Sequence, residues 1–227
     1  MDKNGEVRKE KLSPESFLNQ FSRRNSTYKL LKSRITTSQL SDALRNVTGQ
    51  NGVLVGIKPV KKSFKIIGKA TTVKTSANDW GTVINGIYRA KKGNILVISC
   101  DNDDSAVWGE MASTTAKKQG LSGTVIYGAS RDVAGIKKLN YPVFSRDIIP
   151  NAGKPLAEGA VNIAVNCGST IVNPGDFIMG DECGVVSVPK EITEEILEEA
   201  YKIVDNEDHI VRQLDSGKSF LDILGIK

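Results

Sequence analysis

Short apolar runs alternate with helix-like segments through the middle of this 227-residue chain. Residues 94–100 and 123–127 are apolar runs bounded by turn residues, a pattern that is typical of buried strands. Between them, residues 105–119 have a helical pattern, and Gly120 and Gly123 mark the turn that follows. The pattern predicts a βαβ unit, in which the two strands are parallel and the helix forms the crossover.

The alternation continues on both sides of this unit. A helix-like segment covers residues 37–47, a second helix is expected at residues 78–90, and residues 132–139 indicate a further short helix. The remaining apolar runs predict short strands at residues 52–56, 65–73, 141–144, 161–165, 169–172, 177–179 and 185–188. Together these elements predict a strand-rich α/β fold that forms a single domain over residues 35–227.

The formal net charge of +5 is located at the start of the chain. Residues 1–34 hold nine lysines or arginines and four aspartates or glutamates, so the rest of the chain is formally neutral. We therefore expect a basic N-terminal arm over residues 1–34, with a short helix that begins at Ser13-Pro14-Glu15. Because the body has no excess of basic residues, its composition argues against nucleic acid as a partner.

Hydropathy and cysteine usage indicate the cellular compartment of the protein. No apolar run approaches the length of a membrane span, and the first residues lack the basic-then-apolar order of a secretory signal. Cys100, Cys167 and Cys183 are widely spaced, form no paired-ligand motif and lie in apolar, strand-like surroundings. These features favour reduced thiols in a cytoplasmic protein that does not contact a membrane.

Two motifs follow the carboxyl ends of the first two predicted strands. Gly109-Glu110-Met111-Ala112 comes after one strand and opens a helix, and Arg131-Asp132 comes after the other. In parallel sheets, residues just past the strand ends gather at one edge, where helix amino termini also point. Unpaired N–H groups and a glycine at a helix start favour a bound carboxylate or phosphate, and Arg131 adds a bidentate fork. The sequence therefore predicts a small-anion site.

The spacing of these motifs carries a family resemblance. Twenty residues separate Glu110 from Arg131, and Gly128-Ala129-Ser130 precedes the Arg-Asp pair. This pattern resembles the RraA-like family of 4-hydroxy-4-methyl-2-oxoglutarate aldolases, and the similarity spans roughly residues 30–225. Further segments that agree with the resemblance are Thr36–Ala43, Gly68–Thr71, Lys92–Val97, Tyr141–Phe144, Asn173–Asp176 and Gly180–Pro189.

The resemblance implies a swivelling β/β/α domain that assembles as homotrimers or hexamers and cleaves a 4-hydroxy-2-keto acid to pyruvate. It implies that the backbone of Gly109–Ala112, including Glu110 and Met111, and the side chain of Arg131 hold a pyruvate-like carboxylate and oxygen. It assigns Asp132 to a divalent cation, usually Mg²⁺, and Glu110 to an acidic position of the motif. Some family aldolases carry an additional acidic residue where this chain has Gly135. The resemblance therefore does not specify the outer coordination shell of the metal or the identity of the acceptor aldehyde or ketone.

Other acidic residues have both functional and structural interpretations. In the family, a further acid comes from the C-terminal region of a neighbouring subunit, and Glu207 is the nearest match as a metal ligand. Ile192, Ile196, Ala200 and Ile203 form an apolar stripe at helical spacing. One further turn of this helix reaches Glu207, which supports its assignment as a metal ligand. Alternatively, the helix ends near Asp205-Asn206 and Glu207 is solvated. For Asp42, a structural role within its helix is as plausible as a role near the site. Asp176 and Asp181 look like turn residues between strands.

The residue types limit the chemistry. The single histidine, His209, argues against a histidine triad or a cluster of histidine ligands. Lysines occur mostly in polar pairs, which suits solvated faces better than a Schiff-base amine. Oxygen ligands select Mg²⁺ or Mn²⁺, which would bind the keto acid and spread the charge of an enolate as a carbon–carbon bond breaks. Pyruvate release and decarboxylation of oxaloacetate share that enolate, so the sequence does not choose between them.

The central motifs have alternative explanations too. An isolated Arg-Asp dipeptide is usually a surface pair, Gly109 is also explained as a packing glycine, and Glu110 as a first-turn acid that the helix dipole favours. The family also includes a regulator that inhibits ribonuclease E, so a non-catalytic protein-binding regulator of a ribonuclease is an alternative function. Retention of Glu110, Arg131 and Asp132 together favours an enzyme. A methyltransferase fits poorly, because the chain lacks a glycine-rich nucleotide loop after an early strand.

Overall fold

A computed structural model describes residues 34–226 of the chain. The chain divides into two units, residues 1–34 and residues 35–227. The short helix expected at Ser13-Pro14-Glu15 lies outside the described residues. The elements that position the candidate site all belong to the second unit.

Four parallel strands form the centre of the main sheet, in the spatial order β6-β5-β3-β2. They are β2 (Ile66–Thr75), β3 (Ile95–Cys100), β5 (Gly123–Ser130) and β6 (Val143–Ile148). Every residue of β3 is buried, because helices cover one face of these strands and the curled sheet surrounds the other. The parallel βαβ arrangement predicted from the apolar runs is confirmed.

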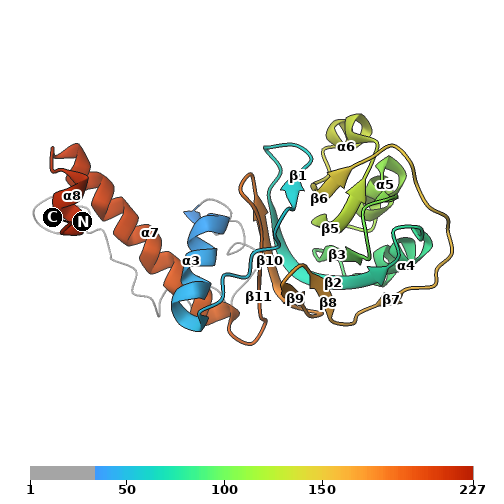
Figure 1. The fold of residues 1–227 in the computed structure, drawn as a ribbon, viewed down its shortest axis with the longest axis horizontal. Helices are drawn as coiled ribbons and strands as arrows, with labels where there is room; N and C mark the ends of the chain where they lie inside the picture. The colour runs from blue at the N-terminus through green and yellow to red at the C-terminus, as the bar shows by residue number, and fades with distance from the viewer. Residues whose placement is uncertain (1–33, 227) are drawn as a thin grey trace, which may run out of the picture. The chain divides into compact units, whose positions relative to one another are not determined.

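Antiparallel strands extend this sheet at both ends. β10 (Phe177–Asp181) pairs with β2, β11 (Gly184–Val188) pairs with β10, and β1 (Lys58–Pro59) pairs with β6. Although β1 and β11 end the strand order, the Nζ of Lys58 donates to the carbonyl of Cys183 beside β11, at 2.6 Å. The result is a nearly closed mixed sheet (Figure 1). Four short strands complete the set: β4 (Ala106–Trp108) on β5, β7 (Ala160–Val161) on β2, and the hairpin of β8 (Val165–Cys167) and β9 (Thr170–Val172).

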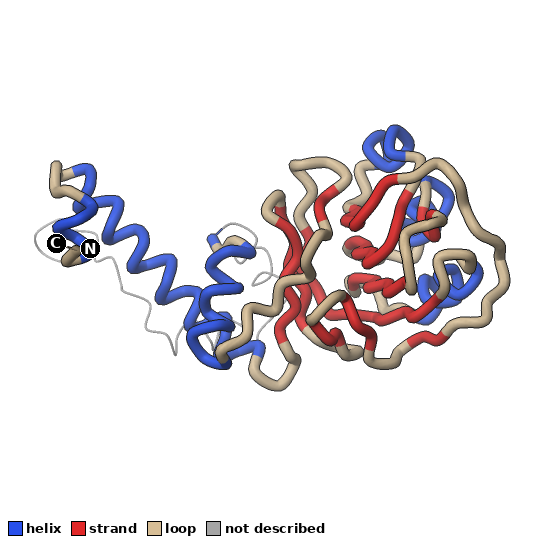
Figure 2. Tube along the Cα trace, viewed as in Figure 1, coloured by secondary structure: helices blue, strands red, loops and turns tan. Residues whose placement is uncertain are grey.

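The helices lie in two groups on opposite sides of this sheet (Figure 2). One group contains α4 (Gly81–Arg89), α5 (Glu110–Lys118) and α6 (Val133–Leu139), which connect the parallel strands. The other contains α3 (Thr37–Thr48) and α7 (Thr193–Asp215), which pack against each other beside β10 and β11 and are followed by α8 (Phe220–Leu224). Among residues 34–226, no helix combines the length and the hydrophobicity that a membrane span requires.

Two buried aspartates have the structural role expected from their turn motifs. Asp181 accepts hydrogen bonds from the N–H and the hydroxyl of Thr37, at 2.9 and 2.7 Å, and so ties the start of α3 to β10. Asp176 accepts the N–H groups of Asn173 and Lys190, at 2.7 and 3.2 Å. These bonds connect the ends of the last strands to the elements that flank them.

Four local predictions are wrong, each for a physical reason. Residues 161–165 do not form one strand, because Asn162 has a positive φ of 61° and the chain is extended only in the separate strands β7 and β8 on either side. Residues 106–108 do not belong to the helix expected at 105–119, because they pair with the end of β5 as β4 and the helix begins after Gly109. Residues 52–56 do not form a strand, since both glycines in that segment have a positive φ and only Val53 bridges to Val186. Cys183, expected in apolar surroundings, is exposed, because it lies in the turn between β10 and β11.

Candidate functional site

Parallel strand pairing brings the two sequence motifs together. β4 and β5 run side by side, and the N–H of Arg131 donates to the carbonyl of Trp108 at 2.9 Å. The chain then turns into α5 on one strand and into α6 on the other, so both helix starts lie at the same sheet edge. The N–H of Glu110 donates to the Oδ2 of Asp132 at 3.2 Å, across a separation of twenty-two residues.

Asp132 has an uncommon backbone conformation at the start of α6. Its φ of 58° and ψ of 39° lie in the left-handed region, which few residues other than glycine, asparagine and aspartate adopt. Its side chain caps no N–H of α6 and instead lies 3.5 Å from the Nε of Arg131. The side chains of Arg131 and Asp132 are 41% and 39% exposed, so solvent reaches both. The carboxylate and the guanidinium are therefore held together but remain accessible.

Gly109 is needed for this close approach. A Cβ built at residue 109 would overlap the Oδ2 of Asp132 and would lie 3.3 Å from the Cγ of Arg131. Any side chain there would push the carboxylate away from the start of α5. The glycine therefore does more than pack the helix on the sheet, since it allows Asp132 to reach the Glu110 N–H.

Glu110 and Gly135 are also matched to each other. A Cβ built at residue 135 would overlap the carboxylate of Glu110, so the glycine leaves room for that side chain beside the first turn of α6. Glu110 is exposed at its position in the first turn of α5. The Glu110 carboxylate therefore occupies the space that a side chain at residue 135 would need.

A cavity of about 430 Å³ opens beside this cluster. Gly109, Met111, Ala112, Arg131 and Asp132 line it, whereas Glu110 does not belong to the lining. Sequence reasoning missed the rest of the wall, which consists of Trp80, Ile84, Ala106, Val107, Trp108, Thr115 and Ala152. The position of Trp80, directly before a helix that follows a parallel strand, is a signal that could have placed it at this edge.

The segment after β6 passes along the cavity and is held there by hydrogen bonds to its backbone carbonyls. The carbonyl of Pro150 accepts a bond of 3.4 Å from the Nη1 of Arg131. The carbonyls of Gly153 and Lys154 accept the Nε1 and the backbone N–H of Trp80, at 3.1 and 3.0 Å. This segment fixes the position of Trp80 and brings Ala152 into the wall of the cavity.

Asp79 anchors the far end of the same segment. Its buried carboxylate accepts the N–H groups of Ala157 and Glu158, at 2.8 and 3.0 Å, and the hydroxyl of Thr82 at 2.6 Å. Burial alone would raise the pKa of Asp79, but these hydrogen bonds outweigh it and hold the pKa far below its ordinary value. Asp79 therefore remains charged and joins the start of α4 to the segment that borders the cavity.

Glu207 lies on α7, away from this cluster within one chain. Its carboxylate accepts a hydrogen bond from the Nε2 of Gln39 on α3, and α7 is on the opposite side of the sheet from α5 and α6 (Figure 1). The helix does not end near Asp205, because α7 continues to Asp215. Glu207 is nevertheless exposed, as expected from the alternative interpretation of its position.

The donors at the site are oxygen atoms. Asp132 provides a half-exposed carboxylate, Glu110 provides a second one that lies against Gly135 of α6, and no group of three or more metal-ligand side chains forms within the described part of the chain. Mg²⁺ is usually held by one or two carboxylates while it keeps several waters. The donor set of one chain therefore fits a hydrated Mg²⁺ or Mn²⁺ ion.

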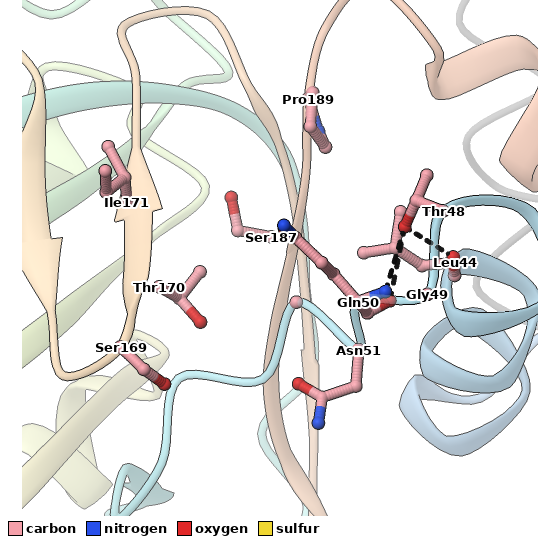
Figure 3. Close-up of a pocket in the computed structure, with 11 residues that line it drawn as sticks. Leu44, Thr48, Gly49, Gln50, Asn51, Ser169, Thr170, Ile171, Ser187 and Pro189 are labelled. Atoms are coloured by element: carbon pink, nitrogen blue, oxygen red, sulfur yellow. Dashed lines mark hydrogen bonds between the residues drawn. The ribbon is translucent and has the colours of Figure 1, made fainter.

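A second cavity, of about 550 Å³, has a different character (Figure 3). It lies between the end of α3, the β8–β9 hairpin and β11, and none of the described residues that line it carries a charge. Thr48 uses its hydroxyl within the chain, because it donates to the carbonyl of Leu44 at 2.7 Å and accepts the N–H of Gln50 at 3.2 Å. This cavity offers neither a cation for an acid substrate nor a carboxylate for a metal.

Comparison with known proteins places the chain in a family. The model of the family described as RraA-like, Aldolase/RraA, matches residues 37–187, which include both motifs of the site. The chain belongs to the RraA-like family. A protein of Methanocaldococcus jannaschii described as uncharacterized is 46% identical over 177 residues, which are 77% of this chain and 85% of that protein.

Other proteins resemble the chain in sequence or in fold. A protein of Halalkalibacterium halodurans named "Putative 4-hydroxy-4-methyl-2-oxoglutarate aldolase" is 35% identical over 169 residues, 74% of this chain and 79% of that protein. The crystal structure of an uncharacterized protein from Pseudomonas syringae has a TM-score of 0.74 and 27% identity, and the match covers 90% of this chain and 91% of that one. The predicted α/β fold of the RraA-like type is thus confirmed.

Proposed function

We propose that this RraA-like protein is a divalent-metal-dependent aldolase, a carbon–carbon lyase that cleaves a 4-hydroxy-2-keto acid, such as 4-hydroxy-4-methyl-2-oxoglutarate, to pyruvate. One observation carries the proposal. The Asp132 carboxylate accepts the N–H of Glu110 at the start of α5, the Arg131 guanidinium lies beside that carboxylate, and both residues line one cavity. Decarboxylation of oxaloacetate is a second reaction of the same site, since it leaves the same enolate.

The keto acid binds through charge and backbone dipoles. In this proposal, the first-turn N–H groups of Met111 and Ala112, which have no partner within the helix, bind the substrate carboxylate. Arg131 forms a bidentate contact with the same group and with the C2 oxygen. When the C3–C4 bond breaks, negative charge accumulates on that oxygen, and the guanidinium stabilises it there.

Asp132 holds the divalent cation in this proposal, with Glu110 beside it. A cation held there would supply Lewis-acid stabilisation for the charge that develops on the substrate. Glu207 from a second copy of the chain, in a homotrimer or hexamer, would be a further ligand. Glu110, which lies outside the cavity lining, accepts the proton of the C4 hydroxyl through water.

Pyruvate release tests the proposal directly. The purified full-length chain is incubated with 4-hydroxy-2-keto acids and with oxaloacetate, and pyruvate is measured by a coupled dehydrogenase. We expect turnover that requires Mg²⁺ or Mn²⁺, disappears with a chelator and returns when excess metal is added. The absence of pyruvate from every substrate at every metal concentration would contradict the proposal and favour a non-catalytic regulator.

Gly135→Ala tests whether the placement of Glu110 matters. The new methyl group overlaps the Glu110 carboxylate and displaces it, so we expect kcat to fall by about tenfold. Alanine is favoured over glycine in a helix by roughly 0.5–1 kcal/mol, so the free energy of unfolding should not decrease. The matched variant Glu110→Gln should lose a similar factor, and the double variant should lose no more than either alone. A fully active Gly135→Ala enzyme would remove Glu110 from the mechanism.

A further inference from the structure

The cavity beside Arg131 and Asp132 has an apolar half that the proposed mechanism does not use. Trp80 just before α4 and Ile84 within it line this half, together with Met111 and Thr115 of α5 and Val107 of β4. Thr115 lies six residues beyond Gly109, which is about 9 Å along a helix, so this half extends away from the charged end. Among the described residues that line the cavity, Arg131 and Asp132 alone carry charge.

The polar atoms of this wall are already used by the protein. The Nε1 of Trp80 donates to the carbonyl of Gly153 at 3.1 Å, and the Nε1 of Trp108 donates to the Oγ of Ser113 at 2.7 Å. The hydroxyl of Thr115 donates to the carbonyl of Met111 at 2.9 Å. A carboxylate placed against this wall would find no cation and no free donor among these groups, and burying it there would cost free energy.

The size of the cavity also exceeds what pyruvate needs. Its volume of about 430 Å³ lies within the roughly 300–1,000 Å³ of pockets that hold drug-sized ligands. The Met111 side chain is 81% exposed at its edge, and a flexible thioether can adapt to apolar groups of different shape. A substrate that fills the cavity therefore places apolar atoms between α4 and α5.

We infer that, among 4-hydroxy-2-keto acids, the site prefers a monocarboxylate whose C4 substituent is an aliphatic or aromatic group over a dicarboxylate such as 4-hydroxy-4-methyl-2-oxoglutarate. The inference rests on the proposed function and specifies its second product, an apolar aldehyde or ketone instead of a second keto acid. The C3–C4 bond breaks and its electron pair remains on C3, which takes up a proton as pyruvate forms. The C4 hydroxyl loses its proton and becomes the carbonyl, so no oxidant or reductant is required.

Two matched substrates test the inference. 4-Hydroxy-2-oxoheptanoate carries a propyl group at C4, and 4-hydroxy-2-oxoglutarate carries a carboxylate there. With the full-length chain and saturating Mg²⁺, we expect kcat/KM for the heptanoate to be at least about tenfold higher. An equal or higher kcat/KM for the glutarate overturns the inference and leaves the aldolase proposal intact. Pyruvate from neither substrate overturns the aldolase proposal, and the inference with it.

Met111→Lys tests the wall itself. The side chain is exposed, so the fold should tolerate lysine, and the new ammonium supplies the cation that a C4 carboxylate lacks. We expect the ratio of the two kcat/KM values to shift toward the glutarate by about tenfold or more. Val55→Lys makes the same change in charge at a residue that is 63% exposed and outside the cavity, and it should leave the ratio unchanged. An unchanged ratio in a folded Met111→Lys variant overturns the inference.

Discussion

Replacing Arg131 with alanine is expected to lower kcat for pyruvate release on the order of 10²–10³-fold, because a positioned donor to a developing oxyanion contributes about 3–4 kcal/mol. The fold should persist. Within residues 34–226 the guanidinium makes only long contacts, 3.4 Å to the carbonyl of Pro150 and 3.5 Å to Asp132, and the side chain is 41% exposed. Steady-state kinetics, together with thermal unfolding, measure both effects.

Two further variants make the result specific to the guanidinium. Arg131→Lys keeps the charge but loses the bidentate fork, so its kcat should fall between those of the wild type and Arg131→Ala. Arg89→Ala removes an exposed arginine at the end of α4, outside the cavity, and should leave kcat unchanged. Wild-type kcat in Arg131→Ala would show that this side chain does not touch the reacting atoms.

The central fold was predictable because its signals are local and strong. The apolar runs that became β3 and β5 lie on both sides of one helical segment, and parallel pairing follows from that order. The strand expected at residues 52–56 failed because apolar composition does not reveal backbone angles. Gly52 and Gly56 both have a positive φ, which bends the segment away from strand geometry. Likewise, residues 106–108 became a strand only because the end of β5 was available for pairing.

The candidate site was predictable in its residues but not in its geometry. The strand-end rule put Gly109, Arg131 and Asp132 at one edge, and the hydrogen bond from the Glu110 N–H to the Asp132 carboxylate agrees with that expectation. The contact of Glu110 with Gly135 could not be seen in the sequence, since it depends on how α5 and α6 pack. The apolar half of the cavity was also missed, because Trp80 and Thr115 resemble ordinary core residues until their neighbours are known.

An aspartate at residue 132 has two possible roles: its carboxylate supplies a negative charge, and its backbone adopts the left-handed conformation. Aspartate tolerates the left-handed conformation observed here, as does asparagine, whereas alanine in that conformation costs about 1–2 kcal/mol. Asp132→Ala would therefore combine a backbone effect with the loss of the carboxylate. Asp132→Asn separates the two, because it keeps the conformation and an acceptor for the Glu110 N–H but removes the charge.

We expect Asp132→Asn to lose at least about 10²-fold in kcat, because the carboxylate is the proposed anchor of a cation that contributes several kcal/mol. Calorimetric titration with Mn²⁺ should show weaker binding, while the thermal unfolding midpoint should stay near that of the wild type. Asp42→Asn is the matched control, since Asp42 pairs with Arg45 on α3 at 2.8 Å, and metal binding there should not change. If Asp132→Asn retains wild-type turnover and Mn²⁺ affinity, the residue serves the backbone of α6, and the metal must be held by other groups.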